Sequence, residues 1–182
     1  MEKEDQQELL KLARNSIETY FKHSDPDTSS VLHLNKKQGV FVTLHKQRDL
    51  RGCIGYIETN RPLFKSVIDA ARAAAFGDPR FPVVMPDELR NIHIEISVLT
   101  IPETIEVKSP KEYKEKIKLG KDGLIIRNPM TSGLLLPQVA TEHHFTVIQF
   151  LNALCQKAGL SFNAWEDLNN EILSFQAEIF SE

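Results

Sequence analysis

Only two cysteines, Cys53 and Cys155, occur among the 182 residues of this chain. Two cysteines form at most one disulfide, so the disulfide framework of a small secreted domain is excluded. No apolar run reaches the roughly 20 residues that a membrane-spanning helix needs. The first residues also lack the basic start and apolar stretch of a secretory signal. We therefore expect a cytoplasmic protein with no membrane association, in which both cysteines are free thiols.

Several signatures of known chemistry are missing as well. The chain has no phosphate-binding glycine loop, no dinucleotide fingerprint and no pair of zinc-ligand motifs. Glu142, His143 and His144 are consecutive, and neighbouring side chains rarely converge on one metal ion, so we predict no metal site. The net charge of -3, with 25 acidic and 22 basic residues, argues against a nucleic-acid partner because phosphate-backbone binders carry a basic excess. The sequence identifies no cofactor.

The hydrophobic residues that are present follow helical and strand periods in turn. Longer helical patterns are expected over residues 1–21, 62–76 and 145–158, and strand patterns over 40–45, 50–58, 92–98 and 172–180. Shorter strands are expected at 124–127 and 134–137, with a glycine turn at 132–133 between them, and an extended segment over 101–107. Shorter helices are expected over 109–118 and 165–168. This mixture has no regular βαβ repeat, so we predict an α+β fold, a mostly antiparallel sheet with flanking helices. No repeat or linker divides residues 1–182, which we assign to one domain.

Residues 50–55, Leu-Arg-Gly-Cys-Ile-Gly, are the strongest functional signal in the chain. In a regular strand Arg51 and Cys53 point to the same face, where a guanidinium favours the thiolate over the thiol. The alternative is structural, because cysteine often behaves as a small buried hydrophobe. Gly52 and Gly55 have the same two interpretations: they permit close approach of a ligand, or close packing of a helix on the sheet.

A cysteine nucleophile needs a base, and the candidates are Glu95, on the polar side of its predicted strand, or one of the histidines at 45, 93, 143 and 144. The loop over residues 77–82 contains two prolines and is therefore stiff. It presents Asp78 and Arg80, which with Arg51 form a candidate set for an anionic ligand. An Asp-Arg pair that locks the loop to the core is the alternative.

Several segments together resemble the AMMECR domain family. The resemblance rests on residues 50–55, 78–81 (Asp-Pro-Arg-Phe), 94–99, 133–140 with its Leu-Leu-Leu-Pro-Gln run, and 154–160 before Trp165. It implies an α+β fold with a larger and a smaller subdomain, and a groove between them near residues 50–55. It also adds Gln138 to the candidate binding residues. Similar domains occur beside Memo-like proteins and radical S-adenosylmethionine enzymes, which implies such proteins as partners in a modification pathway.

Two hypotheses follow, and the sequence leaves open whether the protein is an enzyme. In the first, the protein is a binding or assembly module that holds a small molecule or a protein partner at the groove lined by residues 50–55. In the second, it is an enzyme of unknown substrate in which Cys53 is the nucleophile, Glu95 the base and Arg51 an anion-binding group.

Overall fold

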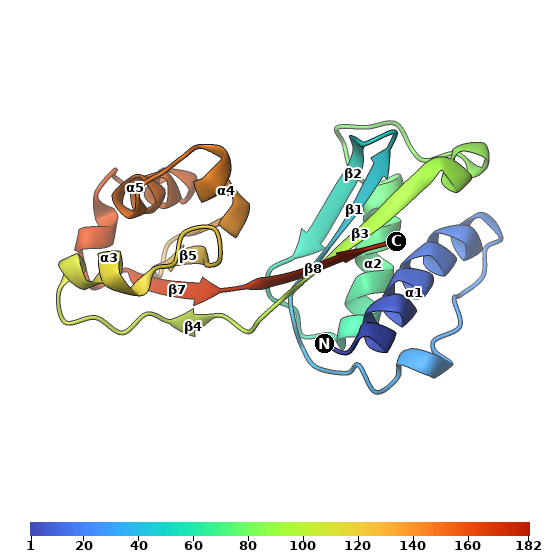
Figure 1. Cartoon of the computed structure of the whole chain (residues 1–182), viewed down its shortest axis with the longest axis horizontal. Coiled ribbons are helices and arrows are strands. Elements are labelled where there is room, and N and C mark those ends of the chain that lie inside the picture. The colour runs from blue at the N-terminus through green and yellow to red at the C-terminus, as the bar shows by residue number, and fades with distance from the viewer. The chain divides into compact units, whose positions relative to one another are not determined.

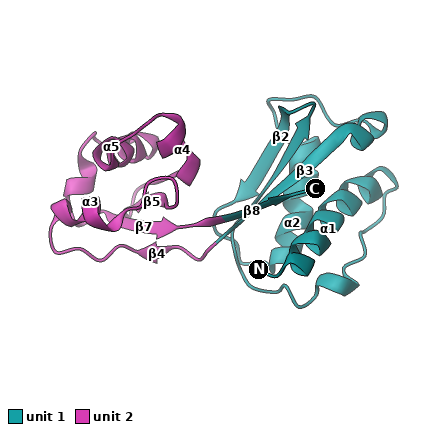
Figure 2. Ribbon diagram, in the orientation of Figure 1, with its two compact units in different colours: residues 1–99, 178–182 teal, residues 100–177 magenta.

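The computed structural model describes all residues, 1–182, and the chain forms two compact units. Unit 1 comprises Met1–Leu99 and Glu178–Glu182, and unit 2 comprises Thr100–Ala177 (Figure 2). Each unit has its own antiparallel sheet, which confirms the predicted α+β class. None of the helices is long and apolar enough to cross a membrane.

Unit 1 is a four-stranded sheet with two helices on one face (Figure 1). The strand order is β2-β1-β3-β8, so β2 and β8 are the edge strands. Its elements are α1 (Lys3–Phe21), η1 (Ser29–Val31), β1 (Val40–Lys46), β2 (Asp49–Tyr56), α2 (Leu63–Phe76), η2 (Pro86–Asn91), β3 (Ile92–Leu99) and β8 (Ala177–Ser181).

The core of unit 1 follows directly from two periods in the sequence. The apolar residues of α1 recur at three- and four-residue steps, as with Leu9, Ala13 and Ile17, and all three are fully buried. Alternate residues of β1 and β3, such as Val42 and Ile96, meet these helices and are also fully buried. The other residues of the same strands consequently point away from the helices.

Unit 2 is a smaller sheet of order β4-β7-β5-β6 with its own core. Its elements are β4 (Glu103–Thr104), η3 (Pro110–Glu112), α3 (Tyr113–Lys116), β5 (Gly123–Arg127), β6 (Ser132–Leu135), α4 (Pro137–Glu142), α5 (Val147–Lys157), η4 (Ala164–Glu166) and β7 (Glu171–Phe175). The predicted helix over 145–158 is confirmed, and Gly159 follows it with a left-handed φ of 72°. Cys155 lies fully buried in this core.

Two predictions in and next to unit 2 were wrong. Gly133 lies within β6 and not in a turn, because the turn is formed earlier, where the Asn128 side chain accepts the backbone N–H groups of Met130 and Thr131. The helix predicted over 109–118 is present over 110–116 as η3 and α3, with Ser109 as its cap, and the extended segment predicted over 101–107 contains the two-residue strand β4. The final apolar alternation, predicted as one strand, is divided at Gln176 into β7 and β8, which belong to different sheets.

Candidate functional site

The 50–55 segment lies in β2, the edge strand of the unit 1 sheet. A two-residue turn at Gln47 and Arg48, with φ angles of 54° and 73°, reverses the chain between β1 and β2. Such left-handed turns match the natural twist of a hairpin. They bring Cys53 opposite Thr43 in the neighbouring strand.

Gly52 is required for packing the helix layer onto the sheet. A Cβ atom at this position would lie 2.2 Å from the carbonyl oxygen of Ala74 in α2. The buried face of α2 is built largely of alanine, which also allows the helix backbone to approach closely. The packing interpretation of this glycine is therefore the one that the geometry supports.

Gly55 points to the opposite side of β2. A Cβ atom there would lie 2.4 Å from two ring atoms of Phe41 and 2.4 Å from the carbonyl oxygen of Val40. The Phe41 ring thus occupies the space that a side chain at position 55 would fill. Aromatic residues commonly cover a glycine of the neighbouring strand in this way.

Cys53 is half-buried and lies outside the hydrophobic core of unit 1. The Thr43 hydroxyl donates a hydrogen bond to its sulfur at an Oγ1–Sγ distance of 3.3 Å. The backbone N–H of Cys53 donates to Asp78 Oδ2 at 2.9 Å, and its carbonyl oxygen accepts from Arg80 Nη2 at 3.2 Å. The loop after α2 therefore satisfies both main-chain groups of this edge residue, much as a further strand would.

Asp78 and Arg80 form a two-point ion pair that holds this arrangement. Arg80 donates to Asp78 through Nε at 3.0 Å and Nη2 at 2.7 Å, and the Arg80 backbone N–H donates to Oδ1 at 3.1 Å. These contacts from Arg80, together with the N–H of Cys53, keep the pKa of the buried Asp78 carboxyl below its usual range despite burial. The geometry matches the loop-locking alternative, while a role in ligand binding stays a prediction.

The Arg51 guanidinium does not lie at the Cys53 thiol, as a regular strand would require. A β-bulge interrupts the ladder, because Leu44 pairs with Gly52 and His45 with Leu50, so that Arg51 has no partner residue. The guanidinium instead donates to Glu88 at 2.6 Å and 3.3 Å and to the carbonyl oxygens of Pro82 and Val83. The expected alternation failed because the bulge reorients this one side chain.

Glu88 is the centre of this second cluster. Burial alone raises the pKa of its carboxyl, but hydrogen bonds from Arg51, Lys46 and the Met85 backbone outweigh burial and lower it to about 2. The cluster joins η2 to the hairpin and leaves Arg51 with its charge neutralised. Sequence reasoning missed Glu88, since no spacing links it to Arg51.

The remaining candidate of unit 1, Glu95, shares a row of the sheet with Cys53. Glu95 is paired with Thr43 on one side of β1, and Cys53 is paired with Thr43 on the other. Strands lie about 4.8 Å apart, so the backbones of Cys53 and Glu95 are about 10 Å apart. Thr43 therefore lies between the proposed nucleophile and the proposed base, and no hydrogen bond joins the two directly.

We call the side of this sheet that α1 and α2 do not cover the outer face. Its strand residues alternate with the buried ones and include neither lysine nor arginine. On β1, β2 and β3 they are Phe41, Thr43 and His45 of β1, Leu50, Cys53 and Gly55 of β2, and His93, Glu95 and Ser97 of β3. The alternation of β1 was the signal that could have added Phe41 and Thr43 to the predicted site.

Gln138 belongs to unit 2, where it is the exposed second residue of α4. The strand predicted over 134–137 ends at Leu135 in β6, and Pro137 instead occupies the first position of α4, which suits proline. Cys155, by contrast, has the raised thiol pKa that burial produces. Among all residues of the chain, no three His, Cys, Asp or Glu side chains gather in a way that could hold a metal ion.

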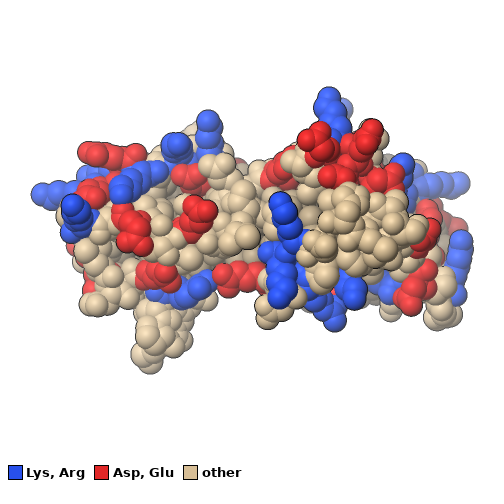
Figure 3. All heavy atoms as spheres, turned by 90° about the horizontal axis from the view of Figure 1, so that it is seen from below, with Lys and Arg blue, Asp and Glu red and all other residues tan.

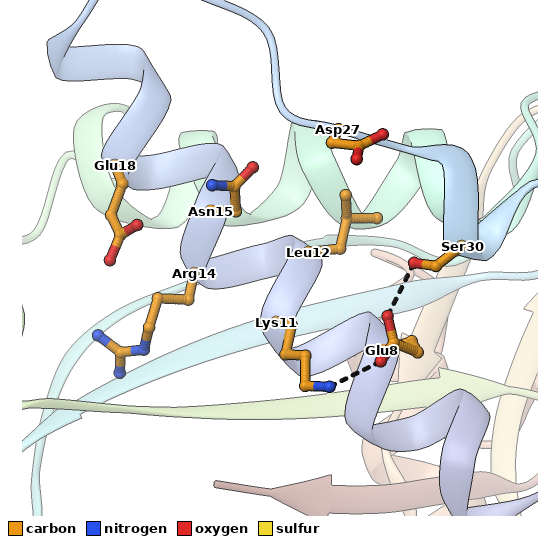
Figure 4. A pocket seen from close by; sticks show the side chains of 8 residues that line it. All are labelled: Glu8, Lys11, Leu12, Arg14, Asn15, Glu18, Asp27 and Ser30. Carbon is orange, nitrogen blue, oxygen red and sulfur yellow. Dashed lines mark hydrogen bonds and ion pairs between the residues drawn. The ribbon is translucent and has the colours of Figure 1, made fainter.

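Two cavities of unit 1 lie along α1, and none of the predicted site residues lines them. The first, of about 390 Å³, is drawn in Figure 4, and the second, of about 360 Å³, lies between α1 and η2. Charged groups in the first cavity are already engaged, since Glu8 pairs with Lys11 and accepts from Ser30. Arg14 is likewise bound to Glu182. These cavities do not offer the free convergent groups of a reaction site.

Comparison with known proteins gives a consistent answer. The AMMECR1 family model matches residues 10–180. A protein of Methanothermobacter thermautotrophicus is 47% identical over 178 residues, covering 96% of this chain and 92% of its own length. A protein of Pyrococcus furiosus is 46% identical, covering 96% of this chain and 86% of its own.

A solved structure agrees with the sequence matches. The crystal structure of an uncharacterised protein from Pyrococcus horikoshii matches with a TM-score of 0.82 and 44% identity, over 96% of this chain and 89% of that one. With a family model over nearly the whole chain and relatives above 40% identity, the chain belongs to the AMMECR1 family.

Proposed function

We propose that this protein is a binding module and that the outer face of the unit 1 sheet, next to the 50–55 segment, receives the ligand. The observation that carries the proposal is the row formed by Cys53, Thr43 and Glu95 on the side of the sheet that the helices leave free. A thiol, a hydroxyl and a carboxylate there stand on three neighbouring strands. Groups on rigid strands are held more precisely than groups on loops.

The surrounding geometry supports binding more than turnover. Arg51 and Arg80, the two guanidinium groups predicted for the site, are engaged by Glu88 and Asp78. A cysteine nucleophile is normally activated by a nearby cation or base, and no such group is hydrogen-bonded to the Cys53 sulfur. The Arg80 guanidinium is close enough to interact with Cys53, but it is already paired with Asp78. The thiol is therefore presented as a polarisable contact and not as an activated group.

The ligand in this proposal is a small molecule or a segment of a protein partner. Figure 3 shows acidic and basic side chains on the same face of the molecule, without one uniform basic field. This distribution is consistent with the small net charge of -3 and gives no support to a nucleic-acid ligand. The family resemblance makes a cytoplasmic modification pathway the setting in which we would search for the ligand.

An enzyme that uses Cys53 is the second candidate. It is favoured by one observation, the hydrogen bond from the Thr43 hydroxyl to the sulfur, because this contact holds the thiol in a fixed position on the outer face. Glu95 remains the candidate base, acting through Thr43 or through a bound substrate group. The two functions share the same face and differ in whether a bond to sulfur is formed.

Capture from a cell extract tests the binding proposal. Immobilised wild-type protein and the variants Glu95→Gln and Thr43→Val would be incubated with extract, and retained small molecules and proteins identified by mass spectrometry. Lys11→Gln, on the helical side of unit 1, is the matched control. We expect a species that the wild type and the control retain and that both face variants lose.

Retention of the same species by both face variants would contradict the proposal. Mass analysis of the protein after incubation separates the two functions. A covalent adduct on Cys53 supports the enzyme, and an unmodified protein with a retained ligand supports the binding module.

A further inference from the structure

The outer face has a chemical character that identifies the class of ligand it can hold. Glu95 is its only acidic side chain, and its carboxylate has neither a hydrogen bond nor an ion pair within the protein. Of the two guanidinium groups next to β2, Arg51 is bound to Glu88 and Arg80 to Asp78. Among the other half-buried carboxylates of unit 1, Glu88 and Asp69 are paired, whereas Glu18 on α1 is not. Glu95 thus offers an unused negative charge.

An aromatic surface lies within reach of this carboxylate. Phe41 is two residues before Thr43, the strand partner of Glu95, so Phe41 and Glu95 are diagonal neighbours on adjacent strands. Diagonal pairs are about 7–8 Å apart at the backbone, close enough for one small molecule to contact both side chains. The Phe41 ring is held against Gly55, which leaves no side chain of β2 between the ring and a ligand.

We infer that the ligand of this face is a small organic cation with a planar amidinium or guanidinium group attached to apolar surface. This inference rests on the proposed function and specifies its ligand. A planar cation can donate two parallel N–H groups to one carboxylate, as arginine does. Its apolar part and its charge are both attracted by an aromatic ring. Anionic ligands are disfavoured by Glu95, and a neutral donor such as an amide can bind the carboxylate but leaves its charge uncompensated.

Three probes of nearly equal shape separate charge from shape. Benzamidine is a planar cation, benzamide is its neutral counterpart and benzoate is the anion. Each would be titrated at pH 8 into ¹⁵N-labelled full-length protein, with binding followed by amide chemical shifts. We expect benzamidine to shift amides of β1, β2 and β3, to bind roughly five- to tenfold more tightly than benzamide and to outcompete benzoate, since tenfold corresponds to about 1.4 kcal/mol.

Matched variants show whether the named residues cause the preference. Glu95→Gln should remove the advantage of benzamidine over benzamide, because it removes the charge and keeps the shape. Glu18→Gln on α1 makes the same change in net charge at a distant half-buried position and should leave the advantage intact. Phe41→Leu should weaken benzamidine and benzamide alike. An unchanged amide spectrum away from each substitution shows that the variants are folded.

Equal affinity for benzamidine and benzamide overturns the inference, as does an equal effect of Glu95→Gln and Glu18→Gln. Shifts confined to α1, or no binding of any probe, overturn it as well. The capture experiment is independent of these outcomes. A species that still requires Thr43 and Glu95 would preserve the binding function while the cationic ligand class is rejected.

Discussion

Gly52→Ala tests the closest contact between the sheet and its helices. The added methyl group would lie 2.2 Å from the Ala74 carbonyl oxygen, whereas real contacts of a Cβ atom are essentially never below 3.0 Å. Backbone atoms must therefore move by about 1 Å, which separates α2 from β2. A gap of this size forfeits a quarter to a half of each contact energy along the interface.

The expected loss of stability is taken from the cost of overpacking in other protein cores. Overpacking costs about 1–3 kcal/mol, and more where backbone must shift. The loss of unfolded-chain entropy on replacing glycine offsets about 0.4–1 kcal/mol. We expect Gly52→Ala to lower the free energy of unfolding of unit 1 by about 2–3 kcal/mol, or the melting temperature by roughly 10 °C or more. Gly77→Ala is the matched control, since its nearest contact is 3.2 Å, and it should change stability by less than about 1 kcal/mol.

The assay must distinguish the two units. The only tryptophan, Trp165, lies in the core of unit 2, so its fluorescence follows the unfolding of unit 2. Hydrogen exchange with mass spectrometry over residues 40–56 and 63–76 follows unit 1. We expect faster exchange in those peptides and unchanged tryptophan fluorescence. A stability of Gly52→Ala within about 0.5 kcal/mol of wild type would refute the packing argument.

Two further predictions concern the side-chain clusters. Glu88→Gln should destabilise unit 1 on the order of 3 kcal/mol at pH 7, because a folded-state pKa of about 2 against the ordinary 4.5 means that the charged form is stabilised by folding. That contribution is fully present above about pH 4.5 and is lost as the pH falls towards 2. The denaturation curves of wild type and variant should therefore converge in acid. A stability difference that persists at pH 2 would show that the Glu88 charge is not what stabilises unit 1. Thr43→Val should slow the alkylation of Cys53 by iodoacetamide in the native protein at pH 7, since the hydroxyl that holds the sulfur in place is lost. Cys155 should stay unlabelled in both until the chain is denatured, and an equal labelling rate of Cys53 in variant and wild type would show that this hydrogen bond does not control the reactivity of the sulfur.

The local hydrophobic patterns of the chain were sufficient to predict the long helices and strands. The four-residue spacing of Leu9, Ala13 and Ile17 predicted α1, and the strict alternation around Ile94 and Ile96 predicted β3. Each of these elements buries one face, so its apolar residues recur with the period of a helix or a strand, and that period can be recognised in the sequence. The mixture of such elements was also enough for the α+β class.

Elements whose limits depend on distant partners were not predictable in this way. Gln176 continues the apolar alternation, yet its backbone N–H donates to the Thr100 hydroxyl and its carbonyl accepts from the Thr100 N–H, and the next strand joins another sheet. Gly133 looked like a turn residue, whereas it permits close approach of Ala158. The partner in each case is far away in the sequence, so no local period encodes the result.

The candidate site likewise has features that the sequence predicted and features that only the tertiary structure decided. The residue types at positions 51–55, 78, 80 and 95 already indicated a thiol, carboxylates and guanidinium groups, because these are properties of the amino acids. Only the tertiary structure decided which charges are used within the protein. A bulge at Arg51 turned its guanidinium to Glu88, the Asp78–Arg80 pair closed the edge of β2, and Glu95 was left unpaired. Charge pairing depends on distances of a few ångströms between separate segments, and such distances exist only once the sheet, the helices and the loops have packed.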